Sequence, residues 1–369
     1  MAFQEHRSLK NSVLQLIADG ATGPQDDNGF NEIALSLFRY QFEMNQPYRA
    51  FCSHRNIAPN IVSHWTEIPA LPTSAFKEFD VACFDPSEAH TVFESSGTTG
   101  SKPSRHHISD LSLYEASLLA HFKLCILPDG KQLPMLLVSQ PPSMAPRSSL
   151  VHMLETVRIE LAAEGDYYID NQGLRLDSIF ESLRRQEEAL QPVAILGTTL
   201  AFVHLLDACQ ERTLRFSLPQ GSRLMDTGGY KGRSREVPKP ELRRLYSSVL
   251  GIPPTHVVNE YGMTEMGSQF YDTSLLDHLG GIAREPRKRG APWTRTTVVD
   301  PETMTQAAPG RTGLLRHYDL TNVDSVIALQ TDDLGVQVDN GFEIVGRAAG
   351  AGARGCSISV DTLLSQARG

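Results

Sequence analysis

The chain has 369 residues, 40% of them hydrophobic and 21% charged, a composition typical of a globular protein. Its net charge of −9 argues against a nucleic-acid-binding protein, because such proteins usually carry a basic face. The N-terminal segment lacks the apolar run of a secretion signal, and no stretch reaches the roughly 20 apolar residues that span a bilayer. We therefore expect a cytoplasmic protein that binds neither nucleic acid nor membrane.

Cysteine usage gives no sign of a disulfide framework or of a zinc site. The number of cysteines is odd, their spacing is wide, and no C-x-x-C pair occurs. Four of them lie in mixed or apolar contexts and are predicted to be small core or near-surface residues: Cys52, Cys83, Cys125 and Cys209. The fifth, Cys356, lies in a glycine-rich stretch and is considered below.

The order of predicted elements indicates the fold class. A helical segment is expected over 1–70, where apolar residues recur at helical spacing. Strands are then predicted at 90–93, 135–138, 193–196, 223–225 and 255–259, and helices at 109–124 with Ser109 as N-cap, 150–161, 201–208 and 240–250. This alternation predicts an α/β core over 71–289, with mainly parallel sheets flanked by helices.

From about residue 290 the helical pattern stops. Strands with glycine and aspartate turns are predicted at 294–300, 313–320, 325–331 and 341–346. We therefore expect a β-rich C-terminal subdomain over 290–369, with antiparallel strands.

A loop rich in small residues follows the strand predicted at 90–93. Its residues are Ser95, Ser96, Gly97, Thr98, Thr99, Gly100, Ser101 and Lys102. Small residues let the backbone approach a polyphosphate closely, and the terminal lysine adds a positive charge. The loop does not match the Walker pattern, so it favours another kind of nucleotide use over a hydrolysing motor. The alternative interpretation is a flexible surface loop.

A second motif follows the strand predicted at 255–259. It reads Asn259, Glu260, Tyr261, Gly262, Met263, Thr264 and Glu265. An aromatic ring, a glycine, a hydroxyl and a carboxylate this close together suit adenine stacking, phosphate contact and Mg²⁺ binding.

Together the two motifs resemble those of the adenylate-forming superfamily, which includes acyl-CoA ligases, nonribosomal adenylation domains and luciferases. That superfamily carries an S-G-T-T-G loop and a Y-G-x-T-E motif. The resemblance implies ATP and Mg²⁺ as cofactors, with the pyrophosphate bound by residues 95–99, the α-phosphate contacted by Thr264 and Mg²⁺ held by Glu265.

Three further segments match the superfamily in the right order. Gly228, Gly229 and Tyr230 lie where it has adenine-contacting glycines, Asp333 matches the ribose-binding aspartate of T-G-D, and Arg347 matches the arginine of G-R-x-x-D. Two departures are evident, since Asp332 replaces the glycine of T-G-D and Gly350 replaces the last aspartate of G-R-x-x-D. The resemblance implies the large domain of the superfamily, without the mobile C-terminal domain and its catalytic lysine.

The segment 314–357 is most similar to the bacterial-luminescence acyl-protein synthetases of the LuxE family. The blocks GGYK, YGMTE, DLTN and RGCS carry this similarity. Those proteins use a cysteine near the C-terminus as acyl acceptor and pass the acyl group to a partner reductase. The resemblance implies that role for Cys356, and the neighbouring Arg354 would favour the thiolate.

The sequence thus predicts a ligase that activates a carboxylic acid as an acyl-adenylate, releases pyrophosphate and transfers the acyl group to a thiol. The thiol would belong to Cys356, to an acyl-accepting protein (a reductase or carrier protein), or to both. Lys102 or Lys231 would supply the positive charge of the missing lysine. Two alternatives stay open: an acyl- or aryl-CoA ligase that uses free CoA, and a degenerate nucleotide-binding subunit, against which the intact YGMTE motif argues.

Three other patterns are predicted to carry no chemistry of their own. Residues 350–355 fit G-x-G-x-x-G, but too few residues follow for a dinucleotide-binding unit. His106 and His107 lack metal-ligand spacing and are expected at the surface or in hydrogen bonds. A solvated loop is expected for the basic cluster of Arg284, Arg287, Lys288 and Arg289.

Overall fold

The structure is a computed structural model that describes residues 2–20, 26–96, 102–229 and 236–348. The chain divides into two compact units. The first contains residues 1–120, 263–269 and 288–369, and the second contains 121–262 and 270–287. The N-terminal helices and the C-terminal strands, which lie in separate predicted domains, thus belong to the same unit.

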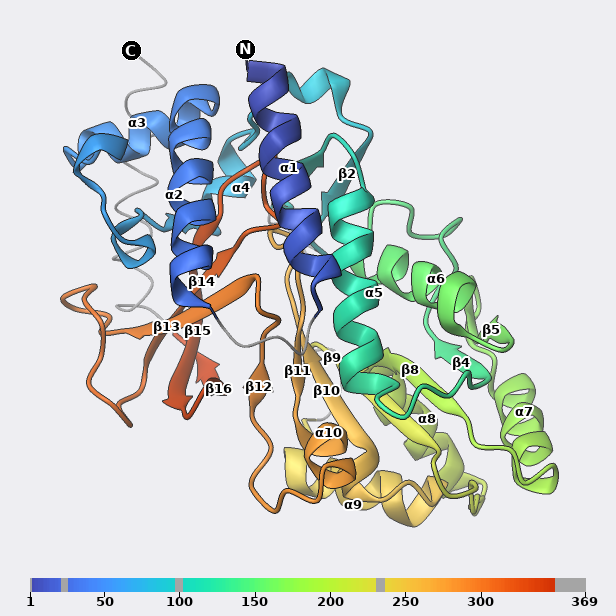
Figure 1. The fold of residues 1–369 in the computed structure, drawn as a ribbon. Coiled ribbons are helices and arrows are strands. Elements are labelled where there is room, and N and C mark those ends of the chain that lie inside the picture. The colour runs from blue at the N-terminus through green and yellow to red at the C-terminus, as the bar shows by residue number, and fades with distance from the viewer. Residues whose placement is uncertain (1, 21–25, 97–101, 230–235, 349–369) are drawn as a thin grey trace. The chain divides into compact units, whose positions relative to one another are not determined.

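The first unit begins with three helices, as expected for the N-terminal segment. They are α1 (Ala2–Ala18), α2 (Asp27–Met44) and α3 (Gln46–His54), and α1 and α2 lie side by side (Figure 1). Leu9, Val13 and Ile17 are buried along one face of α1, since residues four apart share a helix face. A short helix α4 (Ala75–Glu78) follows.

The C-terminal part of the first unit is an antiparallel sheet, which confirms the strands expected there. Its order is β13 (Thr294–Val299), β14 (Gly313–Asp319), β15 (Ala328–Val338), β16 (Gly341–Arg347) and β12 (Lys288–Arg289). The short β1 (Leu71–Pro72) pairs with β15 in parallel. Apart from this sheet, β2 (Thr91–Glu94) and β3 (Arg105–Ile108) form an antiparallel pair.

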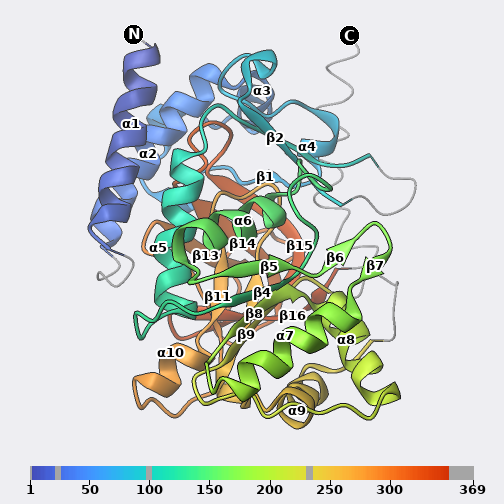
Figure 2. The ribbon, with the colours of Figure 1, turned by 90° about the vertical axis from the view of Figure 1, so that its right-hand side faces the viewer.

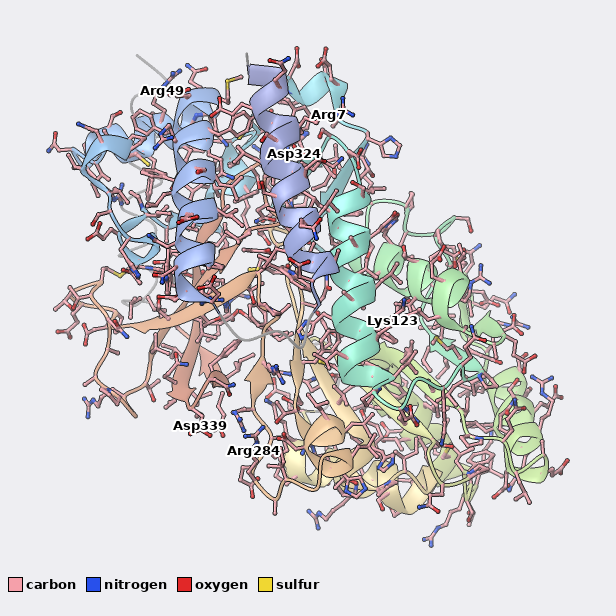
Figure 3. All side chains as sticks on the ribbon, viewed as in Figure 1. Arg7, Arg49, Lys123, Arg284, Asp324 and Asp339 are labelled. Carbon is pink, nitrogen blue, oxygen red and sulfur yellow. The ribbon has the colours of Figure 1, made fainter. Side chains whose placement is uncertain are left out.

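Two polar side chains tie the N-terminal helices to the C-terminal strands of this unit. The amide of Gln41 in α2 donates to the carbonyl of Asn322 at 2.8 Å and accepts from the backbone N–H of Ile327 at 3.0 Å. Asp324, which lies beside α1 in Figure 3, is 2.8 Å from Nε2 of His6. Segments some 300 residues apart in the sequence therefore share one core.

Helix α5 (Ser112–Ile126) begins three residues later than predicted, and Ser109 is not its N-cap. The hydroxyl of Ser109 donates to the carboxylate of Asp324 at 2.6 Å instead. The carboxylate of Asp110 accepts from the backbone N–H of Ser112, the first residue of the helix, at 2.7 Å.

The second unit is the α/β part, and its strands confirm the predicted parallel sheet. The order is β11 (Phe270–Asp272), β10 (Val257–Tyr261), β9 (Arg223–Thr227), β8 (Ala194–Thr198), β4 (Met135–Val138) and β5 (Gly165–Tyr167), all parallel except β11. Two short strands, β6 (Ile169–Asp170) and β7 (Gly173–Leu174), form a hairpin.

Helices connect and cover these strands. They are α6 (Ser149–Leu161), α7 (Leu176–Glu188), α8 (Thr199–Glu211), α9 (Lys239–Leu250) and α10 (Ser274–Leu279). Apolar residues of α7, α8 and α9 form one buried cluster with residues of β4, β8 and β9, and Figure 2 shows the three helices together beside these strands. Helix α9 ends at Gly251, whose φ of 73° is the left-handed conformation that glycine adopts readily.

The basic cluster is only in part the solvated loop that the sequence suggested. Arg284 is exposed, but Arg287 and Lys288 are only 3% and 2% exposed, and the backbone of each joins regular pairing. The carbonyl of Arg287 accepts from Thr273 N–H at 3.0 Å, and Lys288 is paired with Phe342 in β16. None of the described helices combines the length and apolar character that a membrane crossing requires.

Candidate active site

The neck of the predicted phosphate loop is closed by two serines in the first unit. Ser95 N–H donates to the carbonyl of Ser104 at 3.0 Å, and Ser104 N–H donates to the hydroxyl of Ser95 at 2.9 Å. Residues 97–101 between them lie outside the described residues. Lys102 is exposed, with its ammonium 3.9 Å from the carboxylate of Glu78. The two serines thus hold both ends of the loop together.

The segment 263–269, which carries the second half of the YGMTE motif, is held by the turn after β14. Asn322 donates from Nδ2 to the carbonyl of Glu265 at 2.9 Å and accepts from Gly267 N–H at Oδ1, also at 2.9 Å. Asp319 accepts from the backbone N–H and the hydroxyl of Ser268, each at 2.8 Å. The DLTN block therefore fixes the backbone of this segment.

Gly267 is needed where it lies because the two segments approach each other closely. A Cβ at this position would overlap the side chain of Thr321 and come within 3.3 Å of Oδ1 of Asn322. The absence of a side chain is thus a packing requirement at this point.

Glu265 is a buried carboxyl group of the motif. Its side chain is 7% exposed, and burial raises the pKa of its carboxyl. A hydrogen bond from the hydroxyl of Ser104 and the more distant charges of Lys77 and Arg347 lower that pKa to a smaller extent. A buried carboxylate in this state gains stability from a nearby cation, and Mg²⁺ in nucleotide sites is held by one or two carboxylates plus phosphates. Glu265 therefore fits a magnesium ligand.

Asp333 and Arg347 face each other across a strand pair. They are partners in the β15–β16 register, and Nε of Arg347 lies 3.9 Å from Oδ1 of Asp333. Arg347 is 73% exposed, so this ion pair is weak.

In the second unit, the predicted adenine-binding residues lie at the ends of neighbouring parallel strands. Thr227 at the end of β9 pairs with Glu260 of β10, and its hydroxyl donates to the Glu260 carboxylate. Thr199 at the start of α8 donates to the carbonyl of Gly228 at 3.1 Å and so orients the glycine loop. A Cβ at Gly228 or Gly229 would meet no atom of the residues that the structure describes, but Gly228 has a φ of 73° that favours glycine.

Tyr261 is the last residue of β10, and its ring centroid lies 6.0 Å from that of Phe270. The second unit contains residues up to Gly262, and residues 263–269 belong to the first unit. The ends of parallel strands, where Glu260 and Tyr261 lie, are where α/β sheets bind ligands.

Several predicted site residues lie outside the described residues, and their roles stay predictions. They are Gly97, Thr98, Thr99, Gly100, Tyr230, Lys231 and Cys356. Among the described residues no cluster of three histidine, cysteine or acidic side chains suits a metal ion.

Residues outside the two nucleotide motifs hold the segment 263–269. They are His106, Asp319 and Asn322. The sequence gives a signal for Asp319 and Asn322, because both belong to the DLTN block. His106 has the hydrogen-bonded role that is one of the two expected for it.

Comparison with known proteins identifies the family. A model of the LuxE acyl-protein synthetases matches residues 20–365. The long-chain-fatty-acid–luciferin-component ligase of Aliivibrio fischeri is 22% identical over 352 residues, covering 91% of this chain and 89% of the relative. Its counterpart in Vibrio harveyi is 23% identical over 343 residues, covering 89% of this chain and 86% of the relative.

The fold is shared with a solved acyl-CoA ligase. A crystal structure of 2-hydroxyisobutyryl-CoA ligase with 2-HIB-AMP matches with a TM-score of 0.63 at 15% identity. The match covers 86% of this chain and 67% of that chain. The expected α/β fold of the adenylate-forming large domain is confirmed.

Proposed function

Because this chain belongs to the LuxE family of acyl-protein synthetases, we propose that it activates a long-chain fatty acid with ATP and then transfers the acyl group to a thiol. The family match over residues 20–365 carries this proposal, since it includes both nucleotide motifs. The buried carboxylate of Glu265, whose raised pKa is lowered in part by Ser104 at the base of the phosphate loop, supports it.

In the first step a carboxylate oxygen of the fatty acid attacks the α-phosphorus of ATP. A new O–P bond forms, the P–O bond to the leaving group breaks, and pyrophosphate departs. Such a step depends on alignment and on charge stabilisation more than on covalent chemistry. The protein must therefore hold the phosphates and keep the attacking oxygen in line.

The residues divide this work by position. Ser95 to Thr99 bind the pyrophosphate, Thr264 contacts the α-phosphate, and Glu265 holds Mg²⁺, which when bound neutralises phosphate charge. Lys102 or Lys231 adds a mobile positive charge.

The resemblance to the superfamily supports two further assignments. Gly228, Gly229 and Tyr230, with Glu260 and Tyr261, are assigned to the adenine. Asp333 and Arg347, which are partners in the β15–β16 pair, are assigned to the ribose.

In the second step a thiolate attacks the acyl carbon of the adenylate. A C–S bond forms, the C–O bond to the phosphate breaks, and AMP leaves. We assign the first thiol to Cys356, from which the acyl group passes to an accepting protein. The four cysteines at positions 52, 83, 125 and 209 are buried, and burial raises the pKa of Cys209 to about 11, so they suit the role less.

One experiment with two readouts tests both steps. The first readout is acid-dependent pyrophosphate exchange with hexadecanoate, in which Glu265→Gln should lower the rate by at least about 100-fold. Glu302→Gln, at an exposed turn, serves as the matched control and should match the wild type. A folded Glu265→Gln protein with undiminished exchange would refute the assignment of the magnesium ligand.

The second readout is covalent labelling of the chain by radiolabelled hexadecanoate and ATP. Cys356→Ser should keep exchange and lose the label, whereas Cys209→Ala should keep both. If Cys356→Ser and the wild type form acyl-CoA from free CoA at the same rate, direct transfer to CoA replaces the cysteine route.

A further inference from the structure

One buried side chain of β3 reaches the YGMTE segment from the strand that returns from the phosphate loop. His106 lies in β3, two residues after Ser104, and is 1% exposed. The backbone of Ser104 closes the loop on Ser95.

His106 contacts the YGMTE segment at Thr264. Its Nδ1 lies 2.9 Å from the carbonyl of Thr264 and its Nε2 lies 3.0 Å from the hydroxyl of Ser325. A carbonyl only accepts, so Nδ1 carries the proton and Nε2 accepts from Ser325. Burial lowers the pKa of His106 to about 4, so the ring is neutral and its tautomer is set by these two partners.

The imidazole is also fixed in orientation by packing. The ring of Phe76 meets it edge-to-face, with the centroids 5.7 Å apart. The ring therefore has a hydrogen bond on each nitrogen and an aromatic contact, and it cannot turn without losing them.

We propose that His106 is a positioning residue that fixes the backbone of Thr264, and with it the adjacent Glu265, relative to β3. The inference rests on the function proposed above. Nδ1 of His106 bonds the carbonyl of Thr264 while Ser325 and Phe76 hold the ring, so the backbone that carries the α-phosphate and metal ligands keeps its place against β3. The side chain of His106 does not need to touch the substrate for this.

Two variants of His106 separate positioning from general stability. The amide nitrogen of an asparagine can take the place of Nδ1 and donate to the carbonyl of Thr264. The amide oxygen of a glutamine can take the place of Nε2 and accept from the hydroxyl of Ser325, but it leaves the Thr264 carbonyl without a donor. Both substitutions lose one of the two hydrogen bonds and leave similar packing defects, so both should lower the melting temperature by similar amounts.

The exchange kinetics should differ between the two. His106→Asn should keep the maximal rate of hexadecanoate-dependent exchange within about threefold of wild type, while His106→Gln lowers it at least about tenfold. The KM for hexadecanoate should change less than about threefold in both, because the acid does not depend on this contact. Equal maximal rates in the two variants overturn the proposal.

A readout without the fatty acid distinguishes failure of this inference from failure of the proposed function. If the wild type shows no exchange with hexadecanoate, the proposed substrate class fails. Calorimetric binding of Mg·ATP then tests the positioning role of His106. His106→Asn should bind as tightly as the wild type and His106→Gln about tenfold more weakly. Equal affinities overturn the inference, and a wild-type chain that binds no Mg·ATP overturns both.

Discussion

At the scale of single residues, His317 shows how burial controls protonation. It lies in β14, fully buried, with Nδ1 2.9 Å from the hydroxyl of Thr296 and its ring 5.5 Å from that of Phe342. Burial lowers the pKa of His317 to about 3, so the imidazole stays neutral in the folded protein. In the unfolded chain the same group takes up a proton near its ordinary pKa of about 6.5.

This difference predicts acid sensitivity of the fold. Between about pH 6.5 and pH 4 the unfolded chain binds a proton that the folded chain does not, so the free energy of unfolding rises with pH in this window. His317 should contribute a slope of about 1.4 kcal/mol per pH unit. His317→Asn should remove that slope, as measured by urea unfolding at several pH values, while an asparagine at the exposed His54 should leave it unchanged. A His317→Asn protein with the wild-type slope contradicts the explanation.

At the scale of elements, the segment 263–269 gains its shape from the turn at Asp319–Asn322. It forms no helix or strand, and its local hydrogen bond is a turn from the N–H of Met266 to the carbonyl of Met263 at 3.1 Å. Other backbone groups are satisfied by the Asn322 amide and the Asp319 carboxylate, both buried. An irregular buried segment needs such side-chain partners, since unpaired backbone groups are costly.

Asn322→Ala should therefore affect stability and activity together. It leaves Gly267 N–H and the Glu265 carbonyl without their partner, which should lower the free energy of unfolding by about 3 kcal/mol. Pyrophosphate exchange should fall as well at temperatures where the protein remains folded, because Glu265 moves with its backbone. Asn171→Ala, in the exposed β6–β7 turn, is the control and should change stability by less than about 0.5 kcal/mol. Full activity in folded Asn322→Ala would argue that the turn serves stability alone.

At the scale of the whole molecule, the two ends of the chain contribute to the same compact unit. Gln41 of α2 lies fully buried against the segment after β14 and bonds both a carbonyl and an N–H there. A buried side-chain amide that satisfies two backbone groups of a distant segment links the folding of the two ends.

Gln41→Leu should test this link. The substitution keeps the approximate volume but leaves the Asn322 carbonyl and the Ile327 N–H unpaired, so the free energy of unfolding should fall by about 2–4 kcal/mol. Protection of β14 and β15 amides from hydrogen exchange should fall together with that of α2 if the unit unfolds cooperatively. Gln15→Leu on the exposed face of α1 should change little. Loss of protection in α2 alone would show that the N-terminal helices unfold independently.

The motifs of the candidate site could be recognised in the sequence because each is carried by residues that are close together. A strand followed by a loop of small residues, and a strand followed by YGMTE, are local patterns. The structure places Glu260 and Tyr261 at the end of β10 and buries Glu265. The contact of His106 was not predictable, because a histidine in a short strand is common and only its partner at position 264 distinguishes it.

The sequence by itself determined the fold class, the order of its elements and the two nucleotide motifs, since hydrophobic periodicity and residue chemistry act over a few neighbouring positions. Tertiary structure alone decided which residues far apart in the sequence come into contact. Arg287 and Lys288 are buried, Ser109 bonds Asp324 instead of capping a helix, and α2 packs against residues 322–327. These outcomes depend on which segments meet, and that is set by the packing of the whole core rather than by any local pattern.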